Sequence, residues 1–290
     1  MRTEGPDAAM PGDRQLGHEA AEVDAGRRFG GLDRLYGSGS SVRLAAGHAC
    51  VVGIGGVGSW AAEALARSGV GRITLIDLDH VAESNINRQA QALGSTLGQA
   101  KVRAMAARIH DINPCCELTP VDDFLTPENA FVLLEGVDAV IDATDNVHAK
   151  VAMAAWCRQQ ARALVMAGGA GGKTDPARIV VDDLSRTEQD PLLAKVRSRL
   201  RKEHGFPRDP KRKFGIEAVF SREPLSYPAA CAPEEGGSAG RGPQGLACAG
   251  YGSSVAVTAS VGLFAAARAL DHLLRVTAHP APHQTPHQTQ

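Results

Sequence analysis

Three features are missing from this 290-residue sequence, and each absence argues against a class of protein. The formal net charge is only −1, so nucleic-acid or membrane binding would require a local patch rather than a global field. The six cysteines include no C-x-x-C pair, so no structural zinc site is expected. Residues 1–26 contain no apolar run of the kind found in signal peptides. Scattered cysteines in such a chain favour a reducing cytoplasm.

Charge is also missing from one long segment. Residues 242–267 contain no charged side chain, and that length could span a bilayer. The segment consists mostly of glycine, alanine and serine, with few large apolar residues to drive insertion. We therefore expect a buried helix packed under a sheet, and no membrane association.

Between residues 49 and 183, strand-like and helix-like segments alternate along the chain. Such alternation predicts a parallel sheet with helices on both faces. The expected fold class is α/β, a doubly wound, mostly parallel Rossmann-like sheet with a C-terminal elaboration. Thr126 and Pro127 predict the start of one helix, with threonine as its cap. The expected strands cover 49–54, 72–77, 116–122, 138–143, 162–168 and 178–183.

The character of the chain changes after residue 184. Leu192, Val196 and Leu200 recur at helical spacing, and Gly205 can end that helix. The expected division is a disordered extension (1–24), a nucleotide-binding domain (25–183), a C-terminal elaboration (184–275) and a disordered tail (276–290). The elaboration contains a basic segment (195–213), a Gly/Pro-rich mobile loop (228–247) and a last helix (252–275).

A glycine-rich loop follows the first predicted strand. Gly53, Gly55 and Gly58 form G-x-G-x-x-G before a helix, and Asp77 ends the next strand. This is the dinucleotide fingerprint, in which glycines clear the path of a phosphate and an acid binds ribose. A helix N-terminus adds free N–H groups and a partial positive charge. The fingerprint predicts a nucleotide, but it does not identify a reaction.

The polar residues after Asp77 favour ATP over a hydride-carrying dinucleotide. Arg88 and Lys101 could neutralise charge on the phosphates, and Asp145 could hold magnesium. Each has an ordinary alternative as well: a surface ion pair, a solvated lysine and a helix cap. The combination with the fingerprint favours the functional interpretation. The group comprises Asn85, Asn87, Arg88, Gln89, Lys101, Asp142 and Asp145.

These motifs resemble the ATP-binding domain of the ubiquitin-activating-enzyme-like superfamily, whose members adenylate carboxylates. Within it, residues 27–275 are most similar to the tRNA threonylcarbamoyladenosine dehydratase family. The similarity extends beyond the nucleotide site, because the region 183–225 is not shared by other branches. The segments that carry it are RFGGLDRLYG (28–37), VVGIGGVGSWAAEALARSGVG (51–71), NINRQ (85–89), VDDF (121–124), AGGAGGKTDP (167–176), DLSRTEQDPLLAKVR (183–197) and VFSREPL (219–225).

The resemblance implies ATP-dependent dehydration of threonylcarbamoyladenosine in the tRNA anticodon loop, through an acyl-adenylate. It implies ATP and Mg²⁺, with Na⁺ or K⁺ as a further candidate. Arg88, Lys101 and Asp145 would be catalytic, Asp145 would bind the metal, and Asp77 would hold the ribose. The nucleotide-binding set would be Gly53, Gly55, Gly56, Gly58, Asp77, Asp79, Asn85, Asn87, Arg88, Lys101 and Asp145.

The resemblance also implies partners. A homodimer is expected, and sulfur-transfer proteins of the cysteine desulfurase system are further candidates. In the superfamily, an arginine finger often comes from the partner's N-terminal R-x-x-R pattern. Here Gly31 occupies the second position, so Arg28 or Arg34 would have to stand in.

The basic segment is the candidate tRNA surface. Nine lysines and arginines face two acids between residues 195 and 213, in a chain that is otherwise near neutral. A solvated helix face is the ordinary alternative. Phe206 and Phe214 could stack on a base or pack in a core. The tRNA-binding residues expected are Arg208, Lys211, Arg212 and Lys213.

Other functions remain open from the sequence. The runner-up is an adenylating enzyme for a carrier protein ending in Gly-Gly, of the molybdopterin or thiamine type. An NAD-binding oxidoreductase and a non-catalytic sulfur-transfer scaffold are further alternatives. Cys231 and Cys248 are nucleophile candidates, although self-cyclisation needs no thioester and an incidental role is favoured. The glycines of 167–172 could form a tight turn or a floor for substrate.

Overall fold

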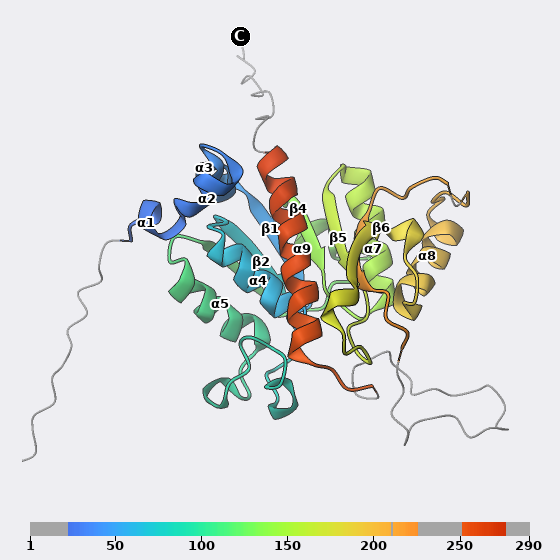
Figure 1. Ribbon diagram of the computed structural model, residues 1–290, viewed down its shortest axis with the longest axis horizontal. Helices are drawn as coiled ribbons and strands as arrows, with labels where there is room; N and C mark the ends of the chain where they lie inside the picture. Colours follow the sequence, from blue (N-terminus) through green and yellow to red (C-terminus); the bar gives the residue numbers. More distant parts are fainter. Residues whose placement is uncertain (1–22, 210, 226–250, 277–290) are drawn as a thin grey trace, which may run out of the picture.

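The computed structural model describes residues 23–209, 211–225 and 251–276 (Figure 1). Most of the expected N-terminal extension, the expected mobile loop 228–247 and the tail from 277 lie outside these residues, as do Cys231 and Cys248. The strands are β1 (His48–Val52), β2 (Arg72–Ile76), β3 (Glu117–Val121), β4 (Ala139–Asp142), β5 (Ala163–Ala167), β6 (Ile179–Asp183) and β7 (Glu217–Ser221).

The described part of the chain forms one seven-stranded sheet of order β3-β2-β1-β4-β5-β7-β6. All neighbouring pairs are parallel except β6 and β7. The predicted α/β, doubly wound class is therefore confirmed, and each of the six predicted strands is present. β7 was not predicted, and it enters the sheet between β5 and β6. Residues that follow position 184 therefore also form part of the sheet.

Helices cover both faces of the sheet (Figure 1). One prediction is wrong: α6 begins at Ala130 rather than at Thr126. The Asn129 side chain donates to the Phe124 carbonyl and accepts from the Thr126 N–H, which closes a turn before the helix. The helices are α1 (Ala25–Phe29), α2 (Gly31–Tyr36), α3 (Ser40–Ala46), α4 (Gly58–Arg67), α5 (Lys101–Ile112), α6 (Ala130–Leu133), α7 (Val147–Gln160), α8 (Pro191–Glu203) and α9 (Val255–Val276).

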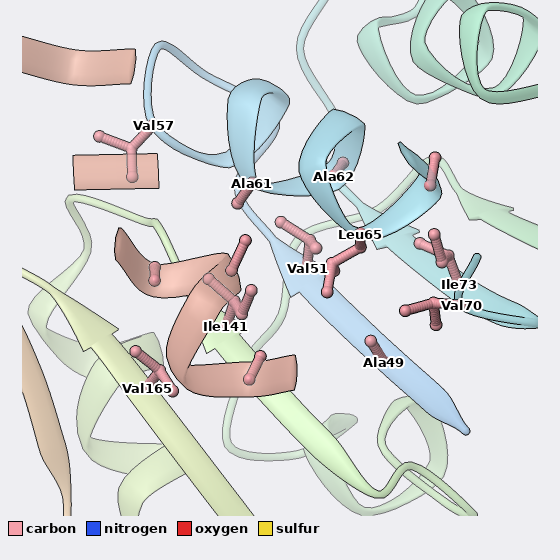
Figure 2. Packing of buried hydrophobic residues seen from close by; sticks show 14 of the residues in the cluster. Ala49, Val51, Val57, Ala61, Ala62, Leu65, Val70, Ile73, Ile141 and Val165 are labelled. Atoms are coloured by element: carbon pink, nitrogen blue, oxygen red, sulfur yellow. The ribbon is translucent and has the colours of Figure 1, made fainter. Parts of the chain in front are cut away.

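Two hydrophobic cores lie on opposite faces of the sheet because side chains alternate along each strand. On β1, Ala49 and Val51 belong to the core under α4 and α9, whereas Cys50 and Val52 belong to the core under α7 and α8. Figure 2 shows the first of these cores, which includes Val51 of β1 and Leu65 of α4. Burial on both faces makes the strands almost continuously apolar.

α9 packs on α4 and crosses β4 and β5 on one face of the sheet (Figure 1). In the described ranges it is the one helix long and apolar enough to cross a membrane, and 50% of that apolar window is buried inside the protein. The burial agrees with the helix expected over the uncharged stretch, although Leu263 and Phe264 remain exposed. At Gly262 the helices approach so closely that a Cβ would lie 2.3 Å from the Val57 carbonyl oxygen.

Gly262→Ala is therefore expected to destabilise the protein. The added methyl group must separate α9 from α4, and overpacking of this kind costs about 1–3 kcal/mol. Thermal unfolding should show a lower Tm, by about 2–4 °C for each kcal/mol. Ala267→Leu, at an exposed position of the same helix, is the control and should leave Tm nearly unchanged. Equal Tm values for the two variants would contradict the close contact.

Candidate functional site

A cavity of about 860 Å³ opens beyond the carboxyl ends of β1, β2, β4 and β5. Ligands of open α/β sheets bind at this edge. The cavity gathers residues that are far apart in the sequence, from the glycine loop to the segment before α9. The predicted site residues that line it are Gly53, Gly55, Gly56, Asp77, Asp79, Asn85, Asn87, Arg88, Lys101 and Asp145.

The glycine loop places two kinds of glycine at the sheet edge. Gly53 has φ +88°, and a Cβ there would lie 2.9 Å from the backbone of Ala143. Gly58 lies outside the cavity lining, and its Cβ would lie 1.8 Å from the Gly53 carbonyl oxygen. The structure thus gives Gly58 a packing role, since it lets α4 start directly against the loop. Around Gly55 there is open space instead.

Asp77 is fixed to the glycine loop by hydrogen bonds. Its Oδ2 accepts from the Ile54 N–H at 2.6 Å, and its Oδ1 accepts from the Asp79 N–H at 2.8 Å. Burial raises the pKa of Asp77, and the nearby Lys101 ammonium opposes that rise. The carboxylate therefore has a set orientation at the cavity wall, directly after β2.

Lys101 begins α5 and points back to the end of β2. Its Nζ lies 2.7 Å from Asp79 Oδ2, with the lysine side chain 7% exposed and the aspartate 60% exposed. The Lys101 N–H also donates to the Asp79 carbonyl at 2.9 Å. Lys101 is thus a shielded cation on the cavity wall rather than a solvated helix residue.

The segment 85–89 lies across the glycine loop. Asn85 accepts from the Ala82 N–H through its side-chain oxygen, which stabilises a short turn at the cavity. Asn87 donates to the Ser253 carbonyl and thereby ties this segment to the chain before α9. Arg88 donates to the Ser84 carbonyl at 2.7 Å, and among the described residues it forms no ion pair with a carboxylate. Its guanidinium is therefore held at the cavity without a neutralising acid.

The two aspartates of 142–145 have different environments. Asp145 is exposed on the cavity wall, and the helix cap of α7 is Asn146 rather than Asp145. Asp142 is fully buried, with its Oδ1 3.0 Å from Nζ of Lys150, whose side chain is also 0% exposed. Burial raises the pKa of Asp142, and the Lys150 ammonium opposes that rise. Lys150 also donates to the Ala167 carbonyl at 2.7 Å, so it joins the ends of β4 and β5.

The far wall of the cavity comes from residues 168–171, which are three glycines and Ala170, and from the start of α8. Asp190 caps α8 through the Leu193 N–H and accepts from the Gly169 N–H at 2.8 Å. Lys173 also lines the cavity and donates to the Gln189 and Glu223 carbonyls. Burial lowers the pKa of Lys173. Sequence reasoning did not single out Lys173, Asp190 or Lys150, because only the fold brings them to this edge.

The predicted tRNA-binding residues lie away from this cavity. Arg208, Lys211, Arg212 and Lys213 are exposed in the segment after α8. Phe206 and Phe214 are buried and contact each other, with ring centroids 5.0 Å apart. They pack in the core, so the base-stacking alternative is wrong.

The structure also bears on the arginine-finger candidates and on metal binding. Neither Arg28 nor Arg34 lines the cavity, and Arg28 donates to the Ile112 carbonyl at the opposite end of α5 from Lys101. Neither of these two arginines therefore reaches the cavity of its own chain. Among the residues described, no three His, Cys, Asp or Glu side chains gather as a metal site.

Fold and cavity together define a Rossmann-like α/β protein with a polar site at the carboxyl edge of its sheet. The chain belongs to the ThiF family, whose family model matches residues 32–289. It is 49% identical over 251 residues to the tRNA threonylcarbamoyladenosine dehydratase of Haemophilus influenzae, covering 86% of this chain and 94% of the relative. The enzyme of the same name from Escherichia coli is 49% identical over 254 residues, with 86% and 94% covered.

Solved structures agree with this assignment. The crystal structure of Escherichia coli tRNA N6-threonylcarbamoyladenosine dehydratase, TcdA, in complex with ATP superposes with a TM-score of 0.77. The two chains are 46% identical, and the match covers 88% of this chain and 97% of the other. The resemblance inferred from the sequence motifs is therefore confirmed.

Proposed function

We propose that this protein uses ATP to dehydrate threonylcarbamoyladenosine in tRNA to its cyclic form, in the cytoplasm. The substrate carboxylate would attack the α-phosphorus of ATP and release pyrophosphate. A group in the same side chain would then attack the activated carbonyl carbon and release AMP. A carboxylate is a poor electrophile and the adenylate is a good one, while ring closure within one side chain has a low entropic cost.

The observation that supports this proposal is the composition of the cavity. Its near wall carries the glycine loop, Asp77, Arg88 and Lys101, which suit a nucleotide, and its far wall comes from 168–173 and 189–192. The far wall belongs to the region that resembles the tRNA-modifying branch. The volume of about 860 Å³ leaves room for a substrate group beside a nucleotide.

Each residue of the near wall has a proposed role. Asp77 would accept hydrogen bonds from the ribose hydroxyls, with Asp79, Asn85 and Asn87 shaping the wall beside it. Arg88 and Lys101 would stabilise negative charge that develops on the phosphates, as preorganised cations do in phosphoryl transfer. Gly55 and Gly56 would let the backbone approach the nucleotide.

Magnesium fits one residue of this site. Mg²⁺ is commonly held by one or two carboxylates together with substrate phosphates, and Asp145 is an exposed carboxylate on the cavity wall. Asp145 would therefore hold the ion, which would neutralise phosphate charge when bound. Asp142 is not a ligand candidate, because it is fully buried against Lys150.

Assembly and further ligands belong to the same proposal. We expect a homodimer, in which Arg28 or Arg34 of one chain would supply the finger to the other. We also expect tRNA to contact Arg208, Lys211, Arg212 and Lys213. A monovalent cation and sulfur-transfer proteins remain candidates on the resemblance alone. Light scattering at micromolar concentration would test the dimer.

Nucleoside mass spectrometry tests the reaction. Purified protein, ATP and Mg²⁺ are mixed with tRNA that carries threonylcarbamoyladenosine, and the nucleoside is expected to lose one water only when ATP is present. Asp145→Ala should lower the rate by about 10²–10³-fold, because a group that holds charge on the phosphates is lost.

The contradicting result is equally specific. ATP binding without any change in nucleoside mass would rule out the tRNA reaction. Carrier-dependent pyrophosphate exchange would then support the runner-up, adenylation of a protein ending in Gly-Gly.

A further inference from the structure

A second, shallow cleft lies on α8, outside the large cavity. Its volume is about 440 Å³, and it is lined by Ala194, Arg197, Ser198, Arg201 and Lys202 together with Arg208 from the following segment. The helical members are spaced by three and four residues, which places them on one face of α8. α8 packs on α7 at the edge of the molecule (Figure 1).

The cleft combines four cations and no acid. Within the described ranges, Arg197, Arg201, Lys202 and Arg208 form no ion pair with a carboxylate. Arg199 on the same helix behaves differently, since it makes two hydrogen bonds of 2.8 Å to Glu203. Arg199 and Glu203 thus have the pairing expected of a solvated helix face, and the cleft does not.

The cleft arginines are also held in place. Arg197 is half-buried and donates to the hydroxyl of Thr187, which is itself buried. The Nε of Arg201 donates to the Pro207 carbonyl at 3.2 Å, and its guanidinium lies 5.3 Å from the Phe214 ring centroid. Burial lowers the pKa of Arg197, and the neighbouring charge of Arg201 lowers it further, while the Asp190 carboxylate opposes this shift without forming an ion pair with Arg197. Two fixed, mutually repelling guanidinium groups form a site that an anion would stabilise.

The position of α8 suggests which anion. Asp190, Pro191 and Leu192, at the start of the helix, line the large cavity. Arg201 follows Leu192 by nine positions, which corresponds to about 13 Å along the helix. Stacked nucleotides place one phosphate per strand every 3.4 Å, so roughly four nucleotides span that distance.

We propose that this cleft binds backbone phosphates of the tRNA, a few nucleotides away from the base that enters the large cavity. The inference rests on the proposed tRNA substrate and assigns its docking site to Arg197, Arg201, Lys202 and Arg208. Of the residues expected from the sequence, only Arg208 belongs to the cleft. Lys211, Arg212 and Lys213 would add attraction from outside it.

Two single variants of the full-length protein give a matched test. Arg201→Gln and Arg199→Gln each remove one positive charge from α8, but only Arg201 faces the cleft. Fluorescence anisotropy with labelled tRNA at several salt concentrations measures affinity and its salt dependence. Arg201→Gln is expected to weaken binding by about 10-fold and to reduce the slope of log affinity against log salt by about 1.

Adding Lys202→Gln to Arg201→Gln should reduce the slope by about 2 in total. Arg199→Gln should bind tRNA as the unmodified protein does, and ATP affinity should be equal in all forms. Equal tRNA affinity and slope for Arg201→Gln and Arg199→Gln would overturn the cleft, with the proposed reaction still standing. An unmodified protein that neither binds nor dehydrates the tRNA would overturn both.

Discussion

Lys101→Met is expected to lower the rate of AMP formation by about 10²–10³-fold at saturating ATP and tRNA. The Lys101 ammonium is shielded from solvent and fixed 2.7 Å from Asp79, so it needs little rearrangement to face a phosphate. Methionine keeps the length of the side chain and removes the charge. The cost in folding free energy should be only about 0–1 kcal/mol, because the Asp79 side chain is already 60% exposed in the pair and water can solvate it once Lys101 is replaced.

The control for Lys101 lies on the same helix. Arg103 is exposed on α5 and does not line the cavity, so Arg103→Met removes a cation without touching the site. Single-turnover AMP formation and calorimetric ATP binding should be measured for both variants. Equal rates for Lys101→Met and Arg103→Met would show that Lys101 does not stabilise the reacting phosphates.

The residues of the near wall could be predicted from the sequence for a physical reason. The glycine loop and Asp77 follow strands that pair directly, β1 with β2, and parallel pairing brings their carboxyl ends together. Any ordered β-α-β unit must place such residues at one edge. Lys101 is the first residue of α5, which begins at the same edge of the sheet.

The far wall could not be predicted in the same way. β7 lies between β5 and β6 although it follows both in the chain, and no local pattern specifies where a late strand enters a sheet. Asp190 reaches Gly169 only because this arrangement brings α8 to the end of β5. Contacts between residues distant in sequence depend on topology, which composition and periodicity do not encode.

Local side-chain chemistry caused the smaller error at α6. Thr126-Pro127 is a good helix start in isolation, but Asn129 makes hydrogen bonds to the backbone on its N-terminal side. Such bonds compete with the first helical turn. For Phe206 and Phe214 the sequence allowed either a surface or a core position. The contact between the two rings, in the core that also contains residues of α8, places both in the core.

Lys150 is the clearest example of a residue whose position could not be predicted from the sequence, since lysine is almost never fully buried unless it is paired. Lys150→Met is expected to reduce the free energy of unfolding by about 3–5 kcal/mol, because Asp142 would remain buried without its counter-charge. Chemical denaturation followed by circular dichroism measures this loss. Lys195→Met, at an exposed position of α8, removes the same side chain at a cost within about 0.5 kcal/mol.

The double variant Lys150→Met/Asp142→Asn separates stability from positioning. Most of the lost stability should return, because no uncompensated buried charge remains. The rate of dehydration should stay about 10- to 100-fold below that of the unmodified protein. In that protein Lys150 joins Asp142, at the end of β4, to the Ala167 carbonyl at the end of β5. Without this link, Asp145 and the glycines of the far wall would no longer be held in place relative to each other. Recovery of both properties would assign the ion pair to stability alone. Recovery of neither would show that the cost of Lys150→Met does not come from the unpaired charge of Asp142.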